Sequence, residues 1–171
     1  MHEKAVSPVI GVLLMLTLTL IIAAIVNSYA GGLVETEPKA PSATLQVTYS
    51  QTGGMEIRHM SGDPIPTASV KLMVRPSETF GRNASQFSSV IQKKYITNDS
   101  GFRTWDGVTT SIRPGDLFSI RPQNLSYLQD IPETNFWFNR SSEPDNRGKT
   151  FFLEIYYRNT MISRNEVLIE G

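Results

Sequence analysis

Residues 6–26 read VSPVIGVLLMLTLTLIIAAIV and carry no charged side chain. As a helix that rises about 1.5 Å per residue, this segment would reach roughly 31 Å, close to the thickness of the hydrocarbon core of a bilayer. The alternative is a buried core helix of a soluble domain, but such a helix normally keeps one polar face, whereas apolar residues here fall on every side at the 3.6-residue spacing. The sequence therefore predicts a membrane-spanning helix near the start of the chain.

Residues next to the apolar segment predict where the helix begins and ends. Ser7 followed by Pro8 is typical of a helix start, with Ser7 as the cap and Pro8 as the first helical residue. The pair Gly31-Gly32 predicts the end of the helix. Lys4, just before the apolar segment, favours an N-terminus inside the cell and a C-terminal part outside.

Three small or polar residues lie within the apolar segment. Gly11 lacks a side chain where another helix could approach closely. The hydroxyl groups of Thr17 and Thr19 can donate to backbone carbonyls one turn earlier. Tolerated polarity in a membrane helix explains all three residues equally well.

The hydrophobic pattern divides the chain into four parts. We expect a leader peptide at residues 1–5, a hydrophobic transmembrane helix at residues 6–30, a linker at residues 31–42 and a β-rich head at residues 43–171. In the head, apolar and polar residues alternate with a period of two, and no helical period intervenes. The predicted fold class is α+β: one long N-terminal hydrophobic helix, then an all-β head of the sandwich or barrel type.

Short alternating segments separated by turn residues predict the strands of the head, at 45–49, 55–59, 70–74, 90–96, 101–105, 117–121, 151–157 and 166–169. The first two flank Thr52-Gly53-Gly54 and predict a hairpin, and we expect the third to follow as another antiparallel strand.

We expect the aromatic residues of the head to pack mainly in its core. Because neighbours on a strand face opposite sides, we expect Trp137, Phe152 and Tyr156 to cover a second sheet or to form a patch for a neighbouring subunit.

The composition excludes several classes of function. The 171 residues include 16 basic and 16 acidic ones, so the zero formal charge gives no sign of a nucleic-acid surface or a polybasic membrane patch. The chain has no cysteine, so the fold depends on neither disulfides nor a Cys-ligated metal.

The distribution of reactive residues predicts no enzyme, cofactor or metal site. His59 shares a strand face with Met55 and Ile57, which favours a core or edge role, and the other histidine, His2, lies in the leader. No serine stands in a Gly-x-Ser-x-Gly turn, and no glycine-rich phosphate loop follows a predicted strand. The aspartates are scattered and do not form the loop of a calcium-binding hand.

Four matches to the Asn-x-Ser acceptor pattern lie in the head, at Asn83, Asn98, Asn124 and Asn139. All four fall in expected loops or strand ends, as accessible acceptors would. These four asparagines are therefore candidate sites of N-glycosylation.

The segment from Glu3 to Met15 closely resembles the N-terminal segment of archaeal type IV pilins. In that family, a class III signal peptidase of the prepilin type cuts on the cytoplasmic side, after a small residue preceded by a charged one. The resemblance implies a cut between Ala5 and Val6, with Lys4 and Ala5 recognised. It also implies a filament core formed by the retained helix, which begins Val6, Ser7, Pro8, Val9, Ile10, Gly11, Val12, Leu13, Leu14 and Met15.

Two departures refine the resemblance. Ile10 would be the fifth mature residue, where bacterial type IV pilins usually carry a glutamate, so no carboxylate of this helix sets the register of assembly. The helix also lacks the glycine-rich start of archaellins. The resemblance therefore implies an adhesion-type pilin.

The resemblance implies a structural subunit of a surface filament used for adhesion. Its partners would be further copies of itself, the prepilin peptidase, the pilus assembly machinery and the membrane, with no nucleic acid. The precursor would lie in the cell membrane, and the mature subunit in an extracellular filament. Two other interpretations stay open: an uncleaved single-pass anchor that carries a ligand-binding β-domain, and a secreted domain cut after Ser28-Tyr29-Ala30.

Overall fold

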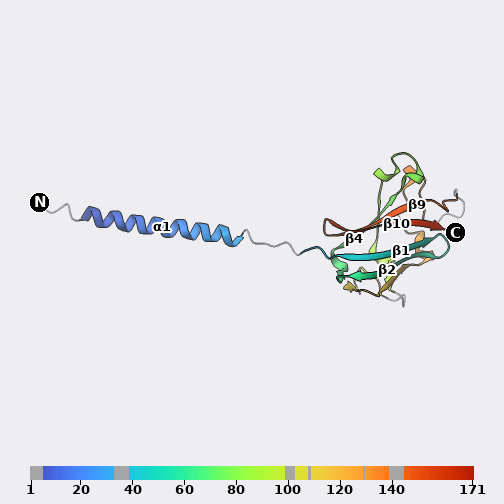
Figure 1. Cartoon of the computed structure of the whole chain (residues 1–171), viewed down its shortest axis with the longest axis horizontal. Helices are drawn as coiled ribbons and strands as arrows, with labels where there is room; N and C mark the ends of the chain where they lie inside the picture. The colour runs from blue at the N-terminus through green and yellow to red at the C-terminus, as the bar shows by residue number, and fades with distance from the viewer. Residues whose placement is uncertain (1–5, 33–38, 99–102, 108, 129, 139–144) are drawn as a thin grey trace. The chain divides into compact units, whose positions relative to one another are not determined.

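The structure is a computed structural model that describes residues 6–32, 39–98, 103–107, 109–128, 130–138 and 145–171 (Figure 1). The chain divides into two compact units, Met1–Lys39 and Ala40–Gly171. The first unit contains one long apolar helix, and the second is a β-rich head, so the predicted α+β fold class is confirmed.

The N-terminal helix α1 spans Val6–Gly32 and has 27 residues. It begins before the predicted cap, so Pro8 is the third helical residue and not the first. A proline costs no bond there, because the first four N–H groups of a helix have no partner within the helix. As predicted, Thr17 and Thr19 donate to the carbonyl oxygens of Leu14 and Leu16, at 3.0 and 2.8 Å.

Ten strands are assigned among the described residues of the head: β1 Ala43–Ser50, β2 Gly54–Gly62, β3 Ile65–Pro66, β4 Val70–Pro76, β5 Ser89–Ile91, β6 Thr97–Asn98, β7 Ser111–Ile112, β8 Leu117–Ile120, β9 Thr150–Tyr157 and β10 Thr160–Glu170. Short helices lie between them: η1 Thr67–Ser69, η2 Glu78–Phe80, η3 Ala84–Gln86, η4 Lys93–Tyr95, α2 Pro122–Leu125 and η5 Pro132–Thr134. They occupy turns between strands, and α2 has only 4 residues.

Eight of these strands form one curled sheet in the order β5-β4-β9-β10-β1-β2-β8-β6, and β3 pairs with β7. Its two halves meet where β10 lies beside β1 (Figure 1). This parallel contact has only two register pairs, Tyr49↔Ile169 and Ser50↔Glu170. Inward-facing residues of both halves, such as Ile57 of β2 and Leu153 of β9, belong to one buried core.

The predicted hairpin is confirmed, because β1 pairs with β2 from Ala43↔Gly62 to Ser50↔Gly54. The third predicted strand also forms, as β4, but it does not continue the hairpin. It pairs with β9 and β5 in the other half of the sheet. Burial explains this choice: Leu72 and Val74 meet the apolar face of β9 there.

The strand predictions at residues 90–96 and 101–105 were partly wrong. Residues 90–96 form only the end of β5 and then the short helix η4. Of residues 101–105, the first two lie outside the described residues, and Thr104 makes an isolated bridge to Thr97. Both segments lie beside the edge strands β5 and β6, which are short.

Most aromatic side chains pack in the core, as predicted. Tyr49, Phe136, Phe138 and Phe151 are buried and meet edge to face, with ring centroids 4.9–6.2 Å apart. Packing of this kind adds to the energy of burial alone.

The outer face of β9 differs from the prediction. Phe152 is half-buried beneath the guanidinium group of Arg164, 4.0 Å from its ring centroid, and Tyr156 donates to Glu154 at 3.2 Å. A charged layer therefore covers these two rings, in place of a second sheet or an open apolar patch.

Candidate functional site

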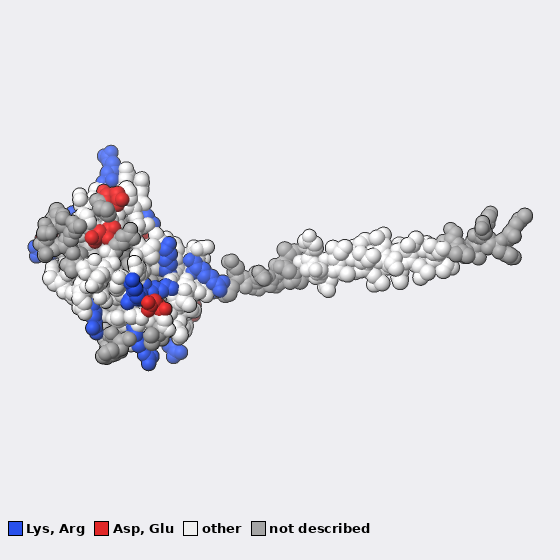
Figure 2. Space-filling view, turned by 180° about the vertical axis from the view of Figure 1, so that it is seen from behind, with Lys and Arg blue, Asp and Glu red and all other residues white. Residues whose placement is uncertain are grey.

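The surface of α1 is the first candidate site. Residues Pro8–Ala30 are long and apolar enough to cross a membrane, and none of the most apolar window among them is buried against the rest of the chain. Figure 2 shows no charged residue on the described part of the helix, whereas charged residues are spread over the visible face of the head. A surface of this kind favours lipid or other apolar helices as neighbours.

The predicted processing residues lie at the start of this helix. Lys4 and Ala5 lie outside the described residues. The predicted core segment, Val6 to Met15, forms the first turns of α1. A Cβ built at Gly11 would meet nothing within 4 Å in the described structure.

The four acceptor asparagines differ in their surroundings. Asn83 is exposed and has a left-handed backbone conformation, with φ of 66°. Asn98 and Asn124 are half-buried, and the side-chain oxygen of Asn98 accepts from the backbone N–H of Arg103 at 3.2 Å. Asn139 lies outside the described residues.

His59 is buried, as predicted for a core histidine, and its Nε2 lies 3.1 Å from the carbonyl oxygen of Ser61. The backbone of His59 also holds the next turn. Its N–H donates to the Asp116 carbonyl at 3.0 Å, and its carbonyl accepts from Gly115 at 2.8 Å. In the described part of the chain, no group of three or more His, Cys, Asp or Glu residues could hold a metal ion.

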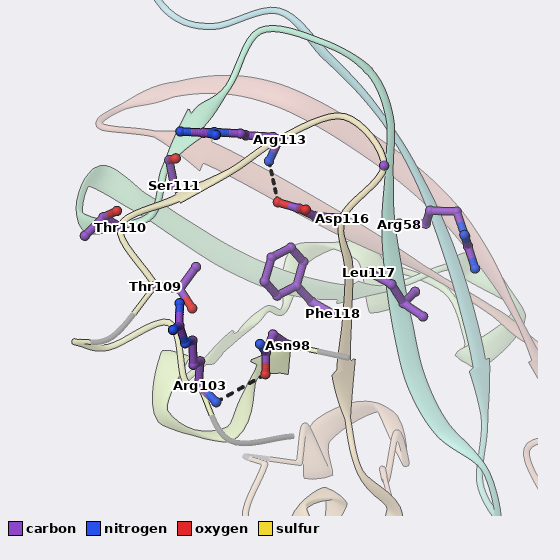
Figure 3. A pocket seen from close by; sticks show the side chains of 11 residues that line it. Arg58, Asn98, Arg103, Thr109, Thr110, Ser111, Arg113, Asp116, Leu117 and Phe118 are labelled. Carbon is purple, nitrogen blue, oxygen red and sulfur yellow. Dashed lines mark hydrogen bonds between the residues drawn. The ribbon is translucent and has the colours of Figure 1, made fainter. Parts of the chain in front are cut away.

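The head also has an open pocket of about 710 Å³, which we call the arginine pocket (Figure 3). Its lining residues come from β2, β6, β8 and the chain between β6 and β8: Arg58, Asn98, Arg103, Thr109, Thr110, Ser111, Arg113, Gly115, Asp116, Leu117 and Phe118. Figure 3 shows Arg103 and Arg113 at opposite ends of one wall, with Thr109 and Ser111 between them.

The wall of the arginine pocket is held by backbone bonds. The N–H of Thr67 donates to the Thr110 carbonyl at 3.1 Å, and the Thr67 hydroxyl donates to the Thr109 carbonyl. At the other end, the N–H of Arg113 donates to the side chain of Asp116 at 2.8 Å (Figure 3). Asp116 is the one carboxylate among the lining residues that the structure describes.

No pattern in the sequence predicts this pocket, because Arg58, Arg103 and Arg113 come from separate parts of the chain. Arg58 lies directly opposite Leu117 in the pairing of β2 with β8. Only the pairing of β2 with β8 brings Arg58 into the same pocket as Arg103 and Arg113.

Comparison with known proteins supports a type IV pilin-like chain. Residues 4–45 match the family model described as the N-terminal part of archaeal type IV pilins. The match includes α1 and reaches Leu45, in the first strand of the head.

An uncharacterized protein of Archaeoglobus fulgidus is 49% identical to this chain over 80 residues. The aligned region covers 46% of this chain and 57% of that relative. The chain therefore matches somewhat more than half the length of this relative.

Proposed function

We propose that this chain is a structural subunit of an archaeal type IV pilus-like surface filament, which polymerises through α1 and uses its head for surface adhesion. One observation carries the proposal: the segment that matches the pilin family includes a helix with large apolar side chains exposed on all sides. Such a surface needs an apolar cover. The bilayer supplies it for the precursor, and identical helices supply it in the filament.

Helix α1 can leave lipid for a helix bundle without exposing unpaired polar groups. Its backbone groups bond within the helix, and the hydroxyls of Thr17 and Thr19 bond to its own carbonyls. Repetition of one head-to-tail interface along a helical path then produces an open filament and not a closed ring.

The proposal includes the division of the chain and its processing. Residues 1–5 form the leader, which prepilin peptidase removes between Ala5 and Val6, and the linker and head follow the helix from residue 31. The role is structural, so we assign no catalytic residue or cofactor.

Among the acceptor asparagines described, Asn83 is the best placed for N-glycosylation, because it is exposed on a loop.

Electron microscopy of cells that overexpress this chain, compared with a deletion strain, tests the proposal. We expect added filaments in the first strain and fewer in the second. N-terminal sequencing of the native protein separates a filament subunit from an uncleaved anchor, since the subunit begins at Val6 and the anchor at Met1 or His2. Equal filament numbers in both strains would overturn the proposal.

The variant Gly11→Leu tests the helix interface more closely. The longer side chain suits lipid but fills a place where a neighbouring helix could approach, because only glycine leaves that surface free. We expect membrane insertion to persist and filament number to fall. Val12→Leu is the control and should assemble like the parent chain. Normal assembly of the Gly11→Leu protein would show that Gly11 does not lie in the helix interface.

A further inference from the structure

We propose that the arginine pocket binds the carboxylate groups of an acidic polysaccharide, such as one built from uronic acid units. This inference rests on the proposed function, since it assigns the adhesive contact of the head. The charge, the hydroxyl groups and the shape of the pocket carry it.

The guanidinium groups of the pocket are available to an anion. Among the described residues, Arg58, Arg103 and Arg113 form no ion pair, and no side-chain hydrogen bond uses their guanidinium groups. All three side chains are exposed. Guanidinium groups bind carboxylates through two parallel hydrogen bonds, so Arg103 and Arg113, at opposite ends of one wall, offer two binding points to an oligomer with repeated carboxylates.

Hydroxyl groups between the two arginines favour a sugar over a simple anion. Thr109, Thr110 and Ser111 line the pocket, and a hydroxyl both donates and accepts, as the hydroxyls of a sugar require. The Thr109 Oγ1 atom is buried and has no hydrogen-bond partner in the described structure. The volume of about 710 Å³ lies within the range of small-molecule sites, about 300–1,000 Å³.

The lining of the arginine pocket argues against a nucleic acid. Among the described residues of the lining, Phe118 is the one aromatic, and it is buried with its ring packed edge to face on Trp105, 5.1 Å between centroids. The described lining therefore presents no aromatic surface on which a base could stack.

The pocket is also organised before a ligand arrives. The backbone N–H and the hydroxyl of Thr67 hold the wall at Thr110 and Thr109, and the backbone bonds of His59 hold the turn after Arg113. Backbone that is already fixed loses little conformational entropy on binding. This favours a specific site over a general attraction of charges.

Calorimetric titration of the full chain in nonionic detergent tests the proposal, with trigalacturonic acid as the probe. We expect saturable binding that weakens as salt rises, because the charges face solvent. The neutral methyl ester of the trimer and sodium acetate should each bind at least about tenfold more weakly. The ester lacks the charged carboxylates, and acetate lacks the sugar hydroxyls. Equal binding of the ester, or stronger binding of a single-stranded oligonucleotide, would overturn the proposal.

Paired variants locate the site. Arg103→Gln with Arg113→Gln should weaken trigalacturonate binding by about tenfold or more. Arg82→Gln removes an exposed arginine outside the pocket and should bind like the parent chain. Circular dichroism checks that both variants are folded. Undiminished binding by the folded double variant would contradict the assignment.

Filament counts separate this inference from the proposed function. Cells with the double variant should form normal filaments but adhere less to a galacturonate-coated surface than cells with the Arg82→Gln protein. Normal filaments without any binding of the probe by the parent chain would overturn the ligand assignment alone. A parent chain that binds the probe but forms no filaments would overturn the proposed function instead.

Discussion

Arg75 of β4 donates two hydrogen bonds to the carboxylate of Glu154 on the neighbouring strand β9, at 3.1 and 3.3 Å. The Glu154 side chain is only 3% exposed, although it lies on the outer face of the sheet. Arg164 of β10 approaches the same carboxylate at 3.6 Å, and Tyr156 donates to it. One carboxylate thus joins three adjacent strands.

Glu154→Ala should destabilise the head by about 2 kcal/mol. Loss of one partner of a buried ion pair costs about 3–5 kcal/mol, but Arg75 and Arg164 are partly exposed here and regain water. Denaturant unfolding of the full chain in detergent measures the change. Glu166→Ala, at an exposed position on β10, should change stability by less than about 0.5 kcal/mol. A loss of equal size in both variants would contradict a special role for Glu154.

Tyr49→Phe should change both stability and its dependence on pH. The Tyr49 hydroxyl donates to the carbonyl of Phe138, and its loss leaves a buried acceptor unpaired, at a cost of about 1–2 kcal/mol at pH 7. Burial and the nearby charge of Asp130 raise the pKa of Tyr49 above its ordinary value of about 10.

The sign of the pH effect follows from this raised pKa. Above about pH 10 the unfolded chain loses the Tyr49 proton while the folded chain keeps it, so the folded state loses stability by about 1.4 kcal/mol per pH unit. Tyr49→Phe lacks this decline, so the difference in stability between the parent chain and this variant should shrink from pH 10 to pH 11. Tyr127→Phe, at an exposed position, should keep the decline. A constant deficit for Tyr49→Phe would contradict the raised pKa.

Gly54→Ala should destabilise the hairpin by about 2 kcal/mol or more. Gly54 has φ of +91°, and a Cβ there would collide with the Ile120 carbonyl and lie 3.2 Å from the Pro122 nitrogen. Thermal unfolding followed by circular dichroism measures the loss. Gly107→Ala is the control, because a Cβ at that position meets nothing within 4 Å. A stable Gly54→Ala protein would show that this turn can relax.

Ala5→Phe should block processing of the leader. The proposed peptidase accepts a small residue before the cut, and a benzyl side chain is too large for such a site. N-terminal sequencing should find Met1 or His2 at the start of the variant protein, against Val6 in the parent. His2→Ala, outside the recognised pair, should be cut normally. A variant that still begins at Val6 would rule out Ala5 as the determinant.

The order of apolar and polar residues predicted the helix and several strands of this fold. The unbroken apolar segment predicted α1, and alternation predicted β1, β2, β8 and β9. It did not predict that β4 would pair with β9, because this choice depends on a segment far along the chain. Glu154 shows the same limit, because only the pairing of β9 with β4 brings Arg75 over it.

The candidate sites divide in the same way. The helix surface could be inferred from composition, since a helix made of apolar residues presents apolar side chains on every side. The arginine pocket could not, because its basic residues come from separate turns and strands. Phe136 and Phe138 illustrate the point for the core, since they lie buried in a segment that had no strand pattern.

The first hairpin also determines how the head would bear tension. Residue 42 is joined to the first residue of β1, and Arg58 of the arginine pocket lies on β2, opposite Gln46. A pull on residue 42 along the axis of β1, with β2 held by a ligand at Arg58, would slide the two strands past each other. The hydrogen bonds of an antiparallel pair lie perpendicular to such a pull, so the pairs from Ala43↔Gly62 onward would share the load. The chain that tethers the head thus enters it through a strand suited to resist being pulled out.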